Sequence, residues 1–139
     1  MSLKPHVIQP VPEETARVAR AGFPHGSPYL TFRDALGTIF QDEDFAALFP
    51  VWGQPGLRPW RLALVTILQF REQLSDRRAA EAVRACIDWK YLLGLELSDP
   101  GFDFSVLSEF RDRLLVGSAE VLLLDKLLER CRALGFLKA

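Results

Sequence analysis

The segment PWRLALVTILQFREQL, at residues 59–74, constrains the fold of this chain more than any other. Its first residue is a proline, which favours the first position of a helix. Apolar residues then follow at positions that go nearly all the way round a helix: Trp60, Leu62, Leu64, Val65, Ile67, Leu68, Phe70 and Leu74. A helix that is apolar on most sides must be covered on most sides. The segment therefore predicts a central, buried helix.

Start signals predict more helices before this one. Pro12 is followed by two glutamates, a pattern that opens a helix running to about Ala21. A capping-box pattern at Thr31 predicts a short helix through Phe40, and Asp42 begins another. Residues 50–59 are expected to form a loop. Between the first two helices the chain is expected to be broken by Gly22, Pro24, Gly26 and Pro28.

Similar signals follow the central segment. Ser75 is expected to cap a helix whose packing continues to Gly94, and residues 95–104 form a loop. Ser105 and Ser118 are expected to cap two further helices. No segment alternates apolar and polar residues as a strand would. The sequence thus predicts an all-α fold, a compact bundle of six or seven helices.

The formal net charge is −1, so the chain as a whole carries no basic signal for nucleic acid. The charge is unevenly distributed, however. Residues 57–90 hold seven Lys or Arg against four Asp or Glu residues, a net charge of +3. A phosphate-binding face is expected to draw on this block.

Residues suited to catalysis or metal binding are sparse. The run Asp42 to Asp44 is better explained by carboxylates at a helix N-terminus than by a metal site. Cys86 and Cys131 fit no metal spacing and are expected to be reduced, buried thiols. No nucleotide-binding or nucleophile motif is present. We therefore expect no catalytic residue, no metal and no cofactor in this chain.

The chain also lacks the features of secreted and membrane proteins. Its N-terminus, MSLKPHVIQPVPEE, has no apolar core of a signal peptide. The sequence has no stretch of about 18 uncharged apolar residues, the length that a helix needs to span a bilayer. A cytoplasmic location is expected.

Two short capped helices carry arginines in positions that suit DNA. The helix after Ser75 has Arg77 and Arg78 in its first turn, and the helix after Ser105 has Arg111 and Arg113 off its apolar stripe, toward solvent. Helix-turn-helix proteins present a recognition helix in this way, although their turn is much shorter than the gap here. Solvated arginines on capped helices also occur in any helical protein.

The same residues resemble a known family. The succession PWRLALVTILQFREQLSDRRAAEAVRACIDWKYLLGLEL, followed by DFSVLSEFRDRLL, resembles the N-terminal helical domain of bacterial insertion-sequence transposases of the DDE class. The similarity covers roughly residues 28–137. Order and spacing of the segments make it specific, whereas each segment alone is weak.

The resemblance implies recognition of double-stranded DNA at the terminal inverted repeats of a mobile element. It implies an extended segment with one short helix at residues 1–30 and the helical domain at residues 31–139. In such transposases an RNase H-like domain with three metal-binding carboxylates follows, and this chain is expected to lack it and hence to have no transposase activity of its own. A truncated copy, a split-frame product and a separate domain stay open.

The residues expected to lie at the DNA follow from these helices: Arg77, Arg78, Arg84, Ser105, Ser108, Arg111 and Arg113. Two other functions remain. An apolar seam at Val121, Leu124, Leu128 and Cys131 would suit a dimer, or pairing with a full-length transposase. A self-contained enzyme is the third alternative.

Overall fold

In the computed structural model, the central segment forms helix α3, Pro59–Glu72. The structure describes residues 10–38, 58–116, 125 and 129. Within the two long ranges the chain forms helices and no strand, so the predicted all-α class is confirmed. The helices are α1 (Glu13–Gly22), α2 (Pro28–Leu36), α3, α4 (Asp76–Ala85), α5 (Ile87–Leu93) and α6 (Ser105–Val116). None of the described helices has the length and apolar character needed to cross a membrane.

The first helix forms where the sequence predicts it, but the second begins earlier than predicted. Ser27 is its cap, because its Oγ accepts a hydrogen bond from the backbone N–H of Tyr29 at 3.3 Å. Pro28, which was expected to break the chain, occupies the first turn. The capping box at Thr31 is therefore wrong, since a serine followed by proline already starts the helix four residues before it.

Several predicted elements lie outside the described residues. These are the end of the second helix at Phe40, the helix beginning at Asp42, the greater part of the loop before Pro59, and the terminal helix after Ser118 with its apolar seam. Within the described range, α2 ends at Leu36.

The helix after Ser75 is interrupted at Cys86. This residue has an extended backbone, with φ −95° and ψ 119°, and it separates α4 from the short helix α5. Its thiol is free and half-buried. The packing nevertheless continues to Gly94, as the sequence predicts, because Trp89, Tyr91, Leu92 and Leu93 of α5 are all buried.

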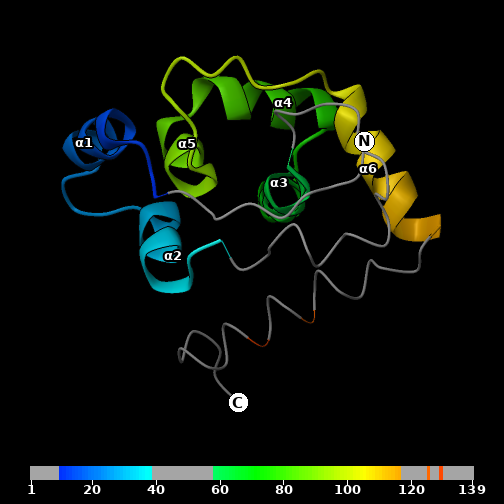
Figure 1. Cartoon of the computed structure of the whole chain (residues 1–139), viewed down its shortest axis with the longest axis horizontal. Helices are drawn as coiled ribbons and strands as arrows, with labels where there is room; N and C mark the ends of the chain where they lie inside the picture. Colours follow the sequence, from blue (N-terminus) through cyan, green and yellow to red (C-terminus); the bar gives the residue numbers. More distant parts are fainter. Residues whose placement is uncertain (1–9, 39–57, 117–124, 126–128, 130–139) are drawn as a thin grey trace.

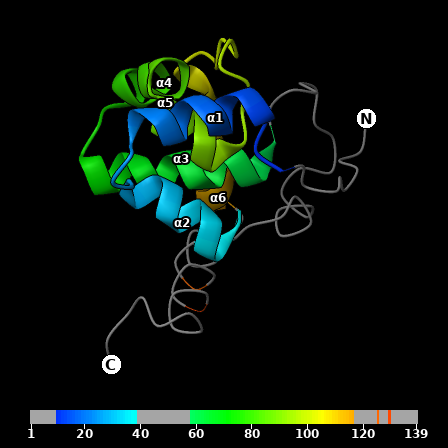
Figure 2. The same cartoon turned by 90° about the vertical axis from the view of Figure 1, so that its left-hand side faces the viewer.

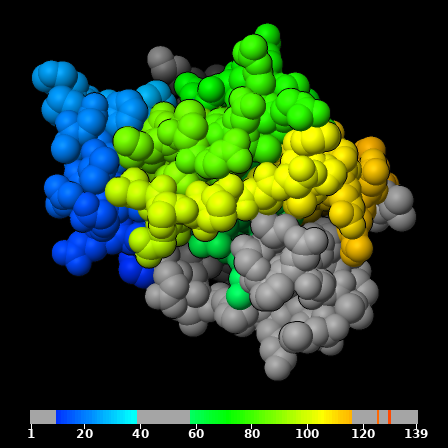
Figure 3. Space-filling model, turned by 90° about the horizontal axis from the view of Figure 1, so that it is seen from above, coloured from blue at the N-terminus to red at the C-terminus, as the bar shows by residue number. Residues whose placement is uncertain are grey.

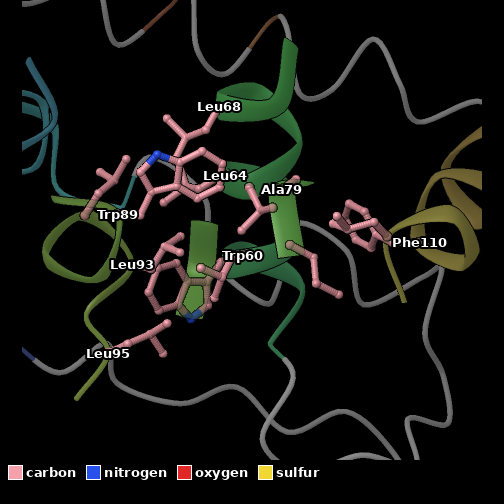
Figure 4. Close-up of a cluster of buried hydrophobic side chains, with 14 of the residues drawn as sticks. Trp60, Leu64, Leu68, Ala79, Trp89, Leu93, Leu95 and Phe110 are labelled. Carbon is pink, nitrogen blue, oxygen red and sulfur yellow. The ribbon is translucent and has the colours of Figure 1, made fainter. Parts of the chain in front are cut away.

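Helix α3 runs through the middle of the molecule, seen end-on in Figure 1 and lengthwise in Figure 2. Helices α1 and α2 lie on one side of it and α6 on the other, with α5 between α3 and the first two helices (Figure 1). The largest apolar cluster joins α3 to α4, α5 and α6. Figure 4 shows part of it, including Trp60, Leu64 and Leu68 of α3, Ala79 of α4, Trp89 of α5 and Phe110 of α6.

Helix α5 is held at its carboxyl end by side chains from three other helices. Arg33 of α2 donates to the carbonyl of Leu92 at 2.8 Å, and Arg61 of α3 donates to the carbonyl of Leu93 at 2.9 Å. Thr15 of α1 donates to the carbonyl of Leu95, two residues beyond the end of α5, at 2.7 Å. The last carbonyls of a helix have no partner within it, so Arg33 and Arg61 satisfy groups that would otherwise be buried unpaired.

Candidate nucleic-acid interface

The candidate interface is built on the junction of α3 and α4. Only Gln73, Leu74 and Ser75 separate the two helices. Gln73 takes the left-handed backbone conformation (φ 56°, ψ 49°), and its N–H closes the end of α3 on the carbonyls of Gln69 and Phe70. Figure 1 shows α3 nearly end-on and α4 lengthwise, and Figure 2 shows the reverse. The axes of the two helices therefore cross steeply.

Ser75 starts α4 as the sequence predicts. Its Oγ accepts from the backbone N–H of Arg78 at 3.2 Å. This bond replaces one of the backbone partners that the first turn of a helix lacks, and it fixes where α4 begins. The register of every outward side chain on α4 follows from that start.

Helix α4 has a strict division between its two faces. Ala79, Ala80 and Val83 are buried against the core. The residues exposed to solvent along the helix are Arg77, Arg78, Glu81, Arg84 and Ala85. Among the described residues, neither Arg78 nor Arg84 has an ion-pair partner. The outer face thus carries three arginines against one glutamate.

An open groove of about 450 Å³ lies between α4 and the loop that precedes α6. Arg77 and Arg84 line it from the helix, and Phe102 and Phe104 line it from the loop. The guanidinium carbon of Arg77 lies 4.3 Å from the centre of the Phe104 ring, a cation–π contact. Figure 3 views α4 (green) beside this loop and the start of α6 (yellow).

The two predicted serines lie at the start of α6. Ser105 does not accept a capping bond: its Oγ donates to Asp103 Oδ2 at 2.5 Å, and the same oxygen accepts from the Ser105 backbone N–H at 3.0 Å. The predicted cap at Ser105 is therefore wrong, because the carboxylate two residues earlier takes that role. Hydrogen bonds from Ser105, together with the charge of Arg77, hold the pKa of Asp103 below its usual value.

The remaining predicted residues of α6 point in different directions. Ser108 donates to the carbonyl of Ser105 at 3.0 Å, and Arg113 lies 4.0 Å from Glu109 on the same helix. The sequence predicted that Arg111 extends toward solvent, and this prediction is wrong. Arg111 pairs with Asp76 at the start of α4, through Nη1 to Oδ1 at 2.6 Å and Nη2 to Oδ2 at 2.8 Å.

The structure thus groups the predicted residues into two sets. Arg77, Arg78 and Arg84 share the outer face of α4, whereas Ser105, Ser108, Arg111 and Arg113 lie on α6, where Arg111 is paired with Asp76. Three contributors were missed: Asp76, Phe104 and the turn at Gln73. Only the turn had a usable signal, since Ser75 follows the end of the central apolar segment directly. No group of His, Cys, Asp or Glu suited to a metal occurs among the residues that the structure describes.

Comparison with known proteins places this arrangement in a family. No match was found among curated proteins or among solved structures. A family model described as Transposase domain (DUF772) matches residues 17–113, which include α3 to α5, α2 and most of α1 and α6. The match covers well over half of the chain, and the chain therefore belongs to this transposase domain family.

Proposed function

We propose that this chain binds double-stranded DNA and recognises the terminal inverted repeats of a transposon, with α4 as the helix that enters the major groove. The observation that carries the proposal is the outer face of α4, where Arg77, Arg78 and Arg84 are exposed. Membership of a transposase domain family supports a role in transposition.

The junction of α3 and α4 suits this role. Helix-turn-helix modules join two steeply crossing helices by three or four residues and place the second helix in the major groove. The N-terminal residues of that second helix reach the base edges. In α4 those residues include Arg77 and Arg78, and arginine binds either guanine or phosphate through two parallel hydrogen bonds. Arg84, two turns further on, is placed to meet the backbone.

The test is binding of the purified chain to the inverted repeats that flank its own gene, measured by fluorescence anisotropy beside a scrambled duplex at two salt concentrations. The expected result is tighter, salt-dependent binding to the native ends. Arg78→Ala is expected to cost about 1–3 kcal/mol if it reads a base, or to reduce the salt slope by about one if it binds a phosphate. Equal binding of both duplexes would overturn the proposal.

Arg17→Ala provides the matched control. Arg17 lies on α1, where it is exposed and pairs with Glu14 one turn away. Its removal takes away the same charge from a different face, so affinity for the native ends is expected to stay close to that of the unchanged chain. Cleavage of the duplex in the presence of a divalent metal would instead point to an enzyme.

A second candidate is a protein-interaction module that pairs with a second copy or with a full-length transposase. It is favoured by two large apolar side chains that are exposed among the described residues, Phe70 of α3 at 77% and Leu115 of α6 at 62%. Exposed apolar side chains of this size are typical of contact surfaces when they gather into a patch. Sedimentation of the chain as a monomer at high concentration would exclude pairing with a second copy, and sedimentation of its mixture with the full-length transposase as separate species would exclude the other pairing.

A further inference from the structure

We infer that Asp76 and Arg111 form a positioning pair that sets the orientation of α4 on DNA, so that Arg111 acts through α4 and does not itself contact DNA. This inference rests on the proposed function. It concerns what fixes the orientation of the arginine side chains on α4.

The pair joins three helices at one point. Asp76 is the first residue of α4, and its carboxylate receives both terminal nitrogens of Arg111 from α6 at 2.6 and 2.8 Å. Gln69 of α3 donates to the same carboxylate at 2.8 Å. A guanidinium that faces a carboxylate with two parallel bonds fixes angle as well as distance. Helix α6 is thereby held to the N-terminal end of α4.

Because of the position of Asp76, this contact can control the orientation of the arginines that follow it. The next two residues are Arg77 and Arg78, so any rotation of the first turn moves both side chains. The turn of three residues fixes one end of α4 to α3, and the bond to α6 supplies a second attachment that resists rotation about the first. A second attachment of this kind matters for a helix in a DNA groove, because contacts with the base edges tolerate little displacement of the side chains.

Charge argues against a direct role for Arg111. Its guanidinium is paired with a carboxylate, and the two charges cancel at a distance. The side chains of Arg111 and Asp76 are 34% and 23% exposed, so both are partly withdrawn from solvent. Hydrogen bonds from Arg111 and Gln69 hold the pKa of Asp76 below its usual value, so the carboxylate stays ionised further into the acid range than a free aspartate would.

The two roles predict opposite effects of Asp76→Asn. This substitution removes a negative charge near the DNA and releases Arg111. If Arg111 were a phosphate contact, binding would become tighter. If the pair positions α4, affinity for the native ends is expected to fall by about tenfold, the size of one lost bidentate contact, despite the more favourable charge.

Glu81→Gln is the control, because it makes the same change of charge on the same helix away from the pair. Its binding to native and scrambled duplexes is expected to become tighter. Arg111→Lys supplies a second variant, since it keeps the positive charge but cannot form the two parallel bonds. It is expected to weaken binding to the native ends with an unchanged salt slope, unlike Arg78→Ala.

The measurements are anisotropy titrations of both duplexes at several salt concentrations, with circular dichroism to establish that each variant is folded. Binding of folded Asp76→Asn as tight as that of the unchanged chain, or normal binding by Arg111→Lys, would overturn the inference and leave the proposed function standing. If the unchanged chain itself fails to distinguish the two duplexes, the proposed function and this inference fall together.

Discussion

Gly94 shows how a single residue decides the geometry at the end of α5. Its φ of +67° lies in the left-handed region, which residues other than glycine rarely adopt. A Cβ atom added there would lie 3.4 Å from Nη1 of Arg33. That same nitrogen donates to the carbonyl of Leu92. The left-handed backbone conformation therefore favours glycine at this position, whereas the space beside Arg33 would admit a Cβ in ordinary van der Waals contact.

Gly94→Ala is expected to lower the free energy of unfolding by about 1–2 kcal/mol, the cost of placing a Cβ in the left-handed conformation. Urea unfolding followed by tryptophan fluorescence measures this change. Gly22→Ala is the control, because Gly22 ends α1 without a positive φ and has nothing within 4 Å of the added atom. It is expected to be neutral or slightly stabilising. Equal losses at both positions would contradict the argument.

At the scale of single residues, the sequence predicted exposure better than partnership. Arg77, Arg78 and Arg84 are exposed as expected, because helical periodicity tells which residues leave the buried stripe. The same periodicity placed Arg111 outside the stripe but could not reveal Asp76 as its partner. The two residues lie 35 positions apart, and only the packing of α6 on α4 brings them together.

Helices α4 and α6 illustrate two ways of starting a helix. In α4 the side chain of Ser75 accepts from a backbone N–H of the first turn. In α6 the acceptor is Asp103, while Ser105 is a donor to that carboxylate. Two serines at similar sequence positions thus have different effects on the stability of the helix that follows.

Ser75→Ala and Asp103→Ala are each expected to cost about 1 kcal/mol, because each removes the acceptor for an N–H at the start of a helix. Ser105→Ala is expected to change the free energy of unfolding by no more than about 0.5 kcal/mol, as for an ordinary surface substitution. Chemical unfolding of the three variants measures the difference. A larger loss in Ser105→Ala than in Asp103→Ala would show that Ser105 is the cap after all.

The elements themselves were predicted well where one start signal stood alone. Pro59 and Ser75 begin helices as expected. The start of α2 was missed because two signals compete over residues 27–34, and the proline in the earlier one also resembles a chain break. Ser75 indicated where the turn between α3 and α4 ends, but the left-handed conformation of Gln73 could not be predicted, because that conformation usually indicates glycine.

For the molecule as a whole, the buried phenol of Tyr29 makes the free energy of unfolding depend on pH in the alkaline range. Tyr29 of α2 donates to Glu72 of α3, which also accepts from the indole nitrogen of Trp89 at 3.0 Å. Burial, followed by the hydrogen bond to Glu72, raises the pKa of Tyr29 to about 12. The folded state therefore keeps this phenol protonated where the unfolded chain releases its proton.

A raised pKa in the folded state means that stability is complete below the unfolded pKa and is lost as pH rises above it. The free energy of unfolding is therefore expected to fall between about pH 10 and about pH 12. Urea unfolding at a series of alkaline pH values measures this. Tyr29→Phe is expected to be less stable at neutral pH, through loss of the hydrogen bond, and to show a shallower decline. An unchanged decline would assign it to other groups.

The overall class could be predicted because no segment favours a strand and because α3 must be covered on most sides. Which helices cover it could not. Periodicity gives the apolar face of each helix but not its neighbour, and α5 meets α1 and α2 through contacts of long sequence separation, such as Arg20 with Tyr91. The buried arginine of α2, Arg33, had no sequence signal, because its acceptor is a backbone carbonyl.

The strict division of α4 into two faces has a consequence for how such a domain can evolve. The positions that support the fold (79, 80 and 83) and the positions that face outward (77, 78, 81 and 84) do not overlap. Substitutions at the outward positions leave the core untouched. If α4 binds DNA as proposed, related proteins can therefore diverge in DNA preference without a loss of stability that selection would remove. Relatives are expected to vary at the outward positions while small or β-branched residues persist at the inward ones.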